Sequence, residues 1–330
     1  MKDTIIMSFK IYDDSVHLHD LNVFRKRARF GLCCINNSLR GTNKKNEIFC
    51  SRSCTRATYT VSRAKELALK NVKDIVKLIE WNRDHNIRHL RLSSDMLPHY
   101  TDPECEKYTM DFADADLKVA GALANTLKHR ITMHPGQFCV VGAKNPNILE
   151  KTTQDLAMHS EILERMGIDD SGILCIHGGG TYGDKESAKR RWIENFDDLP
   201  RKVKSRLCIE NCEKSYSVRD CLDIAQACKI PVILDSHHYN CYCHYHPEYE
   251  QETPEELMDE VIESWASRVP VMHVSEQRET GPVGAHHNYV QTIPSYMIEV
   301  CDKYNTELHI EVEAKAKESA IALLQKRYKM

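Results

Sequence analysis

The sequence predicts a single domain built on a (β/α)₈ barrel of the TIM type. Eight short apolar runs bounded by turn residues, helical periodicity between them, and the lack of a low-complexity linker support this prediction. The runs expected to form strands are Phe30–Ile35, His89–Ser93, Ile131–His134, Ile173–His177, Leu207–Glu210, Val232–Asp235, Val271–Ser275 and Leu308–Glu313. Apolar strands that alternate with amphipathic helices are typical of a parallel sheet covered by helices. The alternation by itself would also fit an open, doubly wound sheet.

Helices are indicated between the strands by residue spacing and by end signals. Four apolar residues between the first two predicted strands recur at i, i+3, i+4 and i+7, which places them on one helical face. They are Val72, Ile75, Val76 and Ile79. Ser217 with Asp220 three residues later resembles a capping box that opens a helix after the fifth strand. Thr253 followed by Pro254 predicts another helix start, because proline is well tolerated in the first helical turn.

Two segments lie outside the regular alternation. Residues 1–28 precede the first strand and are interpreted as an N-terminal extension, which leaves residues 29–330 for the barrel. Residues 37–63 form an insertion between the first strand and the first helix, with six basic residues against one Glu. Such a run is usually a solvated loop, but loops that follow barrel strands build the active-site face. The insertion is therefore a candidate for contact with a polyanion.

Composition restricts the function classes. The chain has 330 residues, of which 42% are hydrophobic, and this is enough for one large core and excludes intrinsic disorder. The 45 Lys and Arg residues nearly balance 48 Asp and Glu residues, so bulk charge does not indicate a protein that coats nucleic acid. No apolar run is long enough to span a bilayer, and the first residues lack a signal-peptide pattern.

The 14 Cys residues bear on the compartment. Without signs of secretion, so many thiols indicate a reducing environment, and we expect an intracellular protein of a bacterial cytoplasm, a nucleus or a viral factory. Nothing in the sequence indicates an oligomer, and we expect a monomer that does not bind membranes.

Ionisable residues gather at the predicted carboxyl ends of the strands. Barrel strands project their end residues from one face toward a common centre. The residues at or next to these ends are His134, His177, Glu210, Asp235, His273 and Glu313, and His238 and His286 follow on neighbouring loops. Imidazoles and carboxylates that converge without a cation would leave buried groups unpaired. We therefore interpret the set as a metal site.

The ligand types limit the metal. Imidazole and carboxylate without thiolate suit zinc, manganese or iron and disfavour calcium. Eight side chains exceed one tetrahedral site and fit a cluster of two or three divalent ions, of the kind that hydrolyses phosphate esters. The ligand set does not separate a phosphodiesterase from a metal-dependent sugar isomerase on the same barrel.

Six ordered motifs resemble the UV damage endonuclease family, whose members are relatives of the metal-dependent apurinic endonucleases. The motifs are Thr132–Phe138, Ile176–Gly183, Ile209–Asn211, Leu234–His238, Gly284–His286 and Glu311–Glu318. They follow the family order, and the resemblance spans about residues 29–318. It implies a TIM-type barrel that nicks UV-damaged double-stranded DNA immediately 5′ of cyclobutane pyrimidine dimers and 6-4 photoproducts, in an alternative excision repair pathway.

The resemblance also implies roles for the residues at the strand ends. Glu210 would bridge an ion held by His134 and His177 to a second ion. The further ligands of the second ion would be Asp235, His273 and Glu313, and those of a third ion would be His238 and His286. The expected catalytic residues are Glu210, His273, Glu313 and Lys317. We expect Mn²⁺, with Zn²⁺ or Mg²⁺ as alternatives.

Other matched positions imply contacts to DNA. Gln137 and Phe138 lie on the loop where the family keeps a pair that wedges into the duplex at the lesion. An amide and a flat ring suit this task, because extruded bases leave a gap that stacking can fill. The alternative is that Phe138 packs beneath the barrel rim. Asn36 matches a polar residue near the lesion, and the basic residues that we expect to contact the duplex are Arg40, Lys44 and Lys45.

Two other functions remain open. An apurinic endonuclease or a sugar isomerase would share the barrel and the metals but lack a photoproduct pocket. A zinc-dependent DNA-binding module without catalysis would be favoured by the Cys-rich and His-rich residues 241–246, for which Cys50 and Cys54 could supply partners. Their C-x-C and H-x-H spacing is tighter than in most structural zinc sites, so free thiols are the preferred interpretation.

Overall fold

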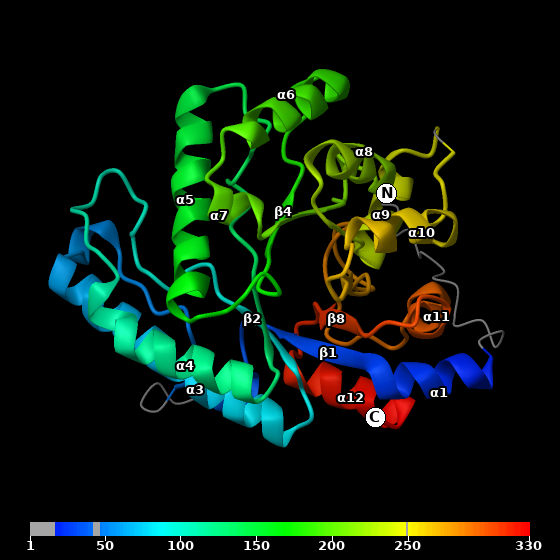
Figure 1. Cartoon of the computed structure of the whole chain (residues 1–330), viewed down its shortest axis with the longest axis horizontal. Helices are drawn as coiled ribbons and strands as arrows, with labels where there is room; N and C mark the ends of the chain where they lie inside the picture. The colour runs from blue at the N-terminus through cyan, green and yellow to red at the C-terminus, as the bar shows by residue number, and fades with distance from the viewer. Residues whose placement is uncertain (1–16, 42–46, 249) are drawn as a thin grey trace.

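The computed structural model describes residues 17–41, 47–248 and 250–330, and it has eight parallel strands with helices between them (Figure 1). The strands are hydrogen-bonded in the order β6-β5-β4-β3-β2-β1-β8-β7. A parallel bridge between Asp235 and His273 brings the two ends of this sheet together. The predicted barrel is therefore confirmed, and the open doubly wound sheet is wrong.

The strands coincide with the apolar runs in the sequence to within a few residues. They are β1 (Ala28–Cys33), β2 (His89–Leu92), β3 (Arg130–Met133), β4 (Leu174–His177), β5 (Leu207–Glu210), β6 (Val232–Ile233), β7 (Val271–Val274) and β8 (Leu308–Val312). β6 is two residues shorter than expected because Asp235 already acts as the N-cap of the next helix. Its side chain accepts hydrogen bonds from the backbone N–H groups of His237 and His238.

Helices and short helical turns connect the strands. They are α1 (Leu18–Arg27), α2 (Asn37–Arg40), η1 (Arg56–Thr58), α3 (Val61–Asp84), η2 (Asp111–Ala113), α4 (Asp114–Thr126), α5 (Pro146–Arg165), α6 (Lys185–Asp197), α7 (Arg201–Lys204), α8 (Val218–Cys228), α9 (Ser236–Tyr245), α10 (Pro254–Ser264), α11 (Ser295–Lys303) and α12 (Glu318–Tyr328). The two predicted helix starts are confirmed. Ser217 forms a capping box with Asp220, and Thr253 forms one with Glu256.

The described part of the N-terminal extension is the helix α1, which runs directly into β1. It packs against α11 and lies along the same side of the barrel as α12 (Figure 1). Phe24 is its buried residue, and the Phe24 ring meets Tyr328 of α12 edge to face with the ring centroids 5.6 Å apart. The extension therefore contributes to the hydrophobic core.

The inside of the barrel is apolar on one side and polar on the other. A separate apolar cluster fills the side of β4 to β7, and its members are Ile173, Cys175, Cys208, Ile233, Trp265 and Val271. On the opposite side, His89 of β2 and Glu311 of β8 face each other, with His89 Nε2 3.0 Å from Glu311 Oε1. Gly31 of β1 leaves room for His89, because a Cβ atom at Gly31 would lie 3.0 Å from the imidazole ring. A polar column thus runs beneath the mouth of the barrel.

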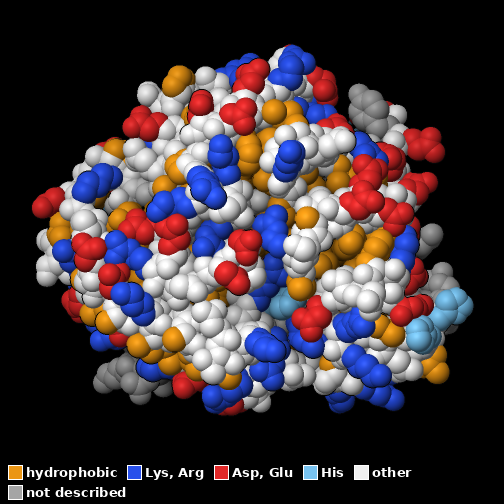
Figure 2. Space-filling view, in the orientation of Figure 1, with side chains coloured by type: hydrophobic (Ala, Val, Ile, Leu, Met, Phe, Trp, Pro, Cys, Tyr) orange, Lys and Arg blue, Asp and Glu red, His pale blue; other side chains and the backbone are white. Residues whose placement is uncertain are grey.

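The outer surface carries both signs of charge. Basic and acidic side chains are interspersed over the face shown in Figure 2, where several Lys and Arg side chains lie close to a recessed His near the middle. Among the described residues, no helix combines the length and the apolar character needed to cross a bilayer.

Candidate active site

The carboxyl ends of the strands bring the predicted metal ligands together. In the register of the sheet, His177 of β4 pairs with Glu210 of β5, and Asp235 pairs with His273 of β7. Because side chains alternate along a strand, paired residues in a barrel point to the same side of the sheet. Residues from distant parts of the sequence therefore meet at one end of the barrel.

Glu210 lies at the centre of this group. Its carboxylate is fully buried, and its Oε2 atom lies 3.0 Å from Nε2 of His134 and 3.8 Å from Nε2 of His177. Its Oε1 atom lies 3.0 Å from Nδ1 of His273 and 3.2 Å from Nδ1 of His238. One carboxylate thus faces four imidazoles.

The remaining predicted ligands surround this centre. Glu313 Oε1 lies 3.4 Å from Nδ1 of His273, and Glu313 Oε2 lies 3.8 Å from Nδ1 of His286. Asp235 uses Oδ1 to cap α9, while its Oδ2 atom is buried without a hydrogen-bond partner in the described part of the chain. A buried carboxylate oxygen without a partner costs free energy, and a bound cation would satisfy it.

The electrostatics of the centre follow from burial and from the close approach of opposite charges. Burial alone would raise the pKa of Glu210, but the neighbouring imidazoles, above all His273 and His177, hold that pKa well below its usual range. Burial likewise opposes protonation of His273, yet the carboxylates of Glu210 and Glu311 raise its pKa well above the ordinary value. For His177 burial prevails and lowers the pKa.

The described residues fit a cluster of divalent cations. Glu210 belongs to three groups of potential ligands, and within each group the ligand atoms lie within 4.8 Å of one another. The groups are His134 with Cys175 and Glu210, His177 with Glu210 and His238, and Glu210 with Asp235 and His273. Backbone acceptors fix two of the rings, because Nδ1 of His134 lies 3.0 Å from the Pro135 carbonyl and Nδ1 of His238 lies 3.0 Å from the Asn211 carbonyl. Such contacts are typical of metal-binding imidazoles.

Comparison with known proteins identifies the family. The family model for UV-endonuclease UvdE matches residues 28–329. The chain belongs to the UvdE family. It is 33% identical to a putative UV-damage endonuclease of Acanthamoeba polyphaga mimivirus, over 91% of both chains. It is also 33% identical to the UV-damage endonuclease of Schizosaccharomyces pombe, over 92% of this chain and 51% of that protein.

A solved structure of the same family has the same architecture. The crystal structure of SacUVDE superposes with a TM-score of 0.79 at 27% sequence identity, over 92% of this chain and 98% of that one. The barrel predicted from the strand pattern is therefore the UvdE barrel.

The loop after β3 presents the predicted wedge of this UvdE member to solvent. Gln137 is exposed, and the Phe138 side chain has 64% of its surface exposed, which is unusual for a large apolar residue. The ring lies over Gly136, where a Cβ atom would come within 2.4 Å of it. The alternative that Phe138 packs beneath the rim is therefore wrong.

Asn36 and Arg40 lie on the loop after β1. Asn36 is buried and caps α2, accepting a hydrogen bond from the Leu39 backbone, while its Nδ2 atom has no partner among the described residues. Arg40 is exposed, with its guanidinium 5.1 Å from the centre of the Phe49 ring. Lys44 and Lys45, the other two predicted DNA contacts, lie outside the described residues.

The start of α2 is held by α12. The buried carboxylate of Glu318 accepts hydrogen bonds from the backbone N–H groups of Asn37 and Ser38, both at 2.8 Å, and from the Ser38 hydroxyl at 2.9 Å. The loop after β1 and the end of β8 are thereby joined. Lys317, the predicted catalytic lysine, directly precedes Glu318 and has a left-handed backbone with φ of 53°. A non-glycine residue with this conformation is strained, and such strain is common at functional sites.

Not all basic residues of the insertion face solvent. Arg52 forms an ion pair with Asp74 of α3 at 2.7 Å, and Arg56 forms one with Asp102 at 2.8 Å. These two side chains fasten the insertion to the barrel, so its exposed positive charge is smaller than the sequence indicates.

Several residues of the centre were not predicted. Glu311 of β8 lies two positions before Glu313, and its Oε2 atom lies 3.2 Å from Nε2 of His273. Arg91 of β2 forms ion pairs with both Glu311 and Glu313. Glu213 lies 3.6 Å from Nε2 of His238. The period-two alternation along β8 would have indicated Glu311, but no local signal distinguishes Arg91 from an outward-facing residue.

The Cys-rich segment does not form a zinc site of its own in the described structure. Among the described residues, no group of three potential ligand atoms within 4.8 Å includes Cys241, Cys243 or His244. Cys241 instead lies on α9 with its Sγ atom 3.7 Å from the His237 ring, and none of the 14 Cys residues, all of which lie in the described part of the chain, forms a disulfide. This arrangement favours free thiols, the preferred interpretation of the segment.

Proposed function

We propose that this UvdE protein is a metal-dependent DNA endonuclease that nicks damaged duplexes immediately 5′ of UV photoproducts. The observation that carries the proposal is the buried carboxylate of Glu210, which faces imidazoles from the loop after β3 and from β4, β7 and α9 at the mouth of the barrel. The UV-damage endonucleases to which the chain is similar supply the substrate class.

Two or three divalent ions, Mn²⁺ by preference, would be held by the eight predicted ligands around Glu210. Such ions supply Lewis acidity, which polarises a phosphodiester, activates water and neutralises the leaving oxygen. The ligands in question are His134, His177, Glu210, Asp235, His238, His273, His286 and Glu313.

The protein's own contribution is to hold these ligands in place. The Arg91 guanidinium pairs with Glu311 and Glu313, so neither carboxylate is free to rotate away from His273. The carbonyls of Pro135 and Asn211 fix the rings of His134 and His238. Preorganised ligands of this kind need no rearrangement when charge develops on a phosphate in the transition state.

Lesion recognition is assigned to the rim of the barrel. Phe138 and Gln137 project into solvent beside the His134 ligand, where a ring and an amide could enter a distorted base stack. Lys317 and Arg40 lie on segments joined by Glu318, and their positive charges would meet DNA phosphates near the scissile bond.

The decisive experiment uses a duplex oligonucleotide with one cyclobutane pyrimidine dimer and a label at either end. We expect one cut directly 5′ of the dimer that leaves a 3′ hydroxyl, loss of cutting after chelation, and recovery with added Mn²⁺. Matched duplexes with an abasic site or without damage serve as controls. Equal cutting of the abasic duplex would favour an apurinic endonuclease, and cutting that survives complete removal of metal would overturn the proposal.

A further inference from the structure

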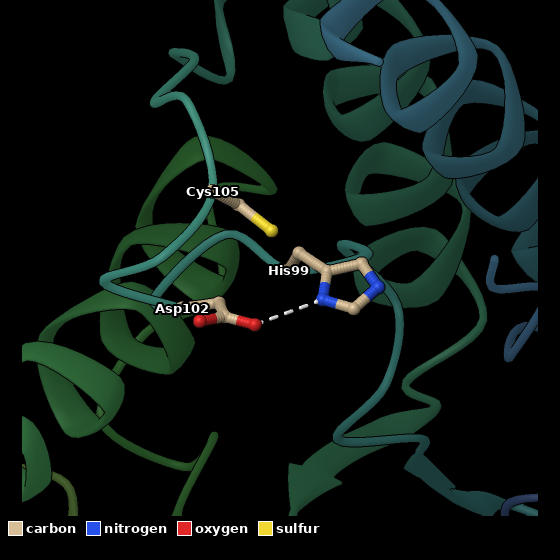
Figure 3. A group of neighbouring side chains, drawn as sticks. All are labelled: His99, Asp102 and Cys105. Carbon is tan, nitrogen blue, oxygen red and sulfur yellow. Dashed lines mark hydrogen bonds and ion pairs between the residues drawn. The ribbon is translucent and has the colours of Figure 1, made fainter. Parts of the chain in front are cut away.

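A second cluster of potential metal ligands lies outside the candidate active site. It consists of His99, Asp102 and Cys105, all on the loop between β2 and α4. Figure 3 shows the three side chains turned toward one another, with the thiol of Cys105 directed at the space beside His99 and Asp102. Their potential ligand atoms lie within 4.8 Å of one another.

The hydrogen bonds of His99 place its Nδ1 atom beside a second acceptor. Its Nε2 atom lies 2.7 Å from the carbonyl oxygen of Cys54, which can only accept a hydrogen bond, so Nε2 carries the proton. In a neutral ring Nδ1 then holds a lone pair, yet it lies 3.1 Å from Oδ2 of Asp102, a second acceptor. Two acceptors at this distance repel each other unless a proton or a metal ion lies between them.

The surroundings match those of a metal ligand set. An imidazole whose outer nitrogen donates to a backbone carbonyl is the usual arrangement for a metal-binding histidine, and ligating carboxylates are themselves hydrogen-bonded. Asp102 meets the second condition, because Arg56 contacts both of its oxygens at 2.8 and 3.0 Å. The Cys105 side chain is buried beside them and adds a soft sulfur donor.

The donor set selects the type of ion. One nitrogen, one oxygen and one sulfur atom suit Zn²⁺, whereas the hard ions Mg²⁺ and Ca²⁺ do not favour a sulfur ligand. The backbone carbonyl of Cys54, a residue of the basic insertion, accepts the hydrogen bond from the His99 ring. A structural zinc site usually has four protein ligands, and we infer the fourth to be the thiol of Cys54, whose carbonyl already contacts His99.

We propose that His99, Asp102 and Cys105 bind a structural zinc ion that fastens the basic insertion to the loop after β2. The two segments already meet there through protein contacts. Arg56 of η1 pairs with Asp102, and the Tyr59 hydroxyl donates to the Glu106 carbonyl. The Tyr59 ring also packs edge to face on His99, with ring centroids 5.4 Å apart. An ion at this point would fix the insertion without entering the chemistry at Glu210.

Zinc and cobalt binding test the site directly on the full-length protein. After removal of all metal, the chain is loaded with Zn²⁺ and its metal content measured, and a second sample is loaded with Co²⁺ for absorption spectroscopy. We expect Cys105→Ser and His99→Gln each to bind one zinc ion fewer per chain than the wild type. In the cobalt sample, we expect the near-ultraviolet thiolate-to-metal band to disappear in Cys105→Ser.

Control variants separate this site from the candidate active site. Cys175→Ser removes the thiol next to Glu210, and Cys243→Ser removes a half-buried thiol of α9; both should keep the cobalt band. The band should also persist in Glu210→Gln, so the zinc site can be present even if the proposed nuclease activity is wrong. Equal zinc content and an unchanged cobalt spectrum in Cys105→Ser would overturn the proposal. So would an NMR spectrum in which His99 stays doubly protonated when Zn²⁺ is in excess, because the cation at Nδ1 would then be a proton.

Discussion

Oε1 of Glu210 lies 3.0 Å from Nδ1 of His273, although 63 residues separate the two along the chain. On its other side the same imidazole faces Glu311, with Nε2 of His273 3.2 Å from Oε2. His273 is thus held between two buried carboxylates, one at the mouth of the barrel and one in the polar column below it. This relationship connects the candidate metal centre to the barrel interior.

Replacing Glu210 by Gln should remove nicking of irradiated plasmid by about 10³-fold or more, because the amide has only one oxygen that can act as a ligand and carries no charge. Nicking rates and bound metal are measured on the same preparation. Glu299→Gln, at an exposed position of α11, is the matched control and should nick like the wild type. Normal turnover in Glu210→Gln would show that catalysis does not need the Glu210 carboxylate.

Glu311→Gln should weaken metal binding roughly 10–100-fold, the usual cost of losing a partner that orients a ligating histidine. The change leaves every predicted ligand in place, so isothermal titration with Mn²⁺ is the direct measurement. Glu307 lies at an exposed position just before β8, so the control variant Glu307→Gln should bind the metal normally. An unchanged affinity in Glu311→Gln would mean that Glu210 and Arg91 suffice to orient His273 and its neighbours.

Phe138→Ala should weaken binding to a dimer-containing duplex by ~1–3 kcal/mol, because stacking of an aromatic ring on a base is worth about that much. Affinity for undamaged DNA should change much less. Since 64% of the side-chain surface is exposed, we expect thermal unfolding of the variant to match the wild type. A lower melting temperature with full lesion affinity would assign the ring to the stability of the loop.

The salt dependence of DNA binding should depend on the insertion. Removing one basic side chain that binds a phosphate should reduce the slope of log K against log salt concentration by about 1. Arg40→Gln combined with Lys44→Gln and Lys45→Gln should therefore flatten the plot. Arg83→Gln, at the end of α3 away from the mouth of the barrel, is the control. If both proteins show the same slope, the insertion does not touch the phosphates.

The free energy of unfolding should fall in mild acid because of His129, which lies just before β3. Burial, assisted by the nearby His89 and Arg88, lowers the pKa of His129 to about 3, against an ordinary value of about 6.5. Between these values the unfolded chain binds the extra proton. Above about pH 6.5, His129 therefore does not lower the free energy of unfolding. Below that pH, the free energy of unfolding falls by about 1.4 kcal/mol for each pH unit.

Urea unfolding at pH 7.5 and pH 5.5 measures this effect. His129→Gln retains a partner for Asn82, whose Nδ2 atom lies 3.4 Å from Nε2 of His129, and should lose about 1 kcal/mol less than the wild type on acidification. Identical pH profiles of the two proteins would mean that His129 takes up its proton in the folded state.

The sequence predicted the parts of the structure that depend on local signals. The strands have apolar runs, the caps at Ser217 and Thr253 have recognisable spacing, and the end of each strand can be located to about two residues. Placement of His177 beside Glu210 then follows from the barrel alone. What could not be predicted depends on partners distant in sequence. The sequence alone presents Arg52 and Arg56 as free charges, whereas in the structure they form ion pairs with Asp74 and Asp102. Arg91 became part of the centre only through Glu311 and Glu313 on β8.

The carboxylate of Glu318, which binds the backbone of Asn37 and Ser38, fixes the distance between two parts of the barrel rim. Through it, the turn that starts at Asn36 is hydrogen-bonded to the segment that follows Glu313. On the proposed function, the turn at Asn36 lies near the distorted bases, and the residues around Glu313 lie near the bond to be broken. The incision would then fall a constant number of nucleotides from the distortion, whatever its chemical nature, without the protein having to read the sequence in between.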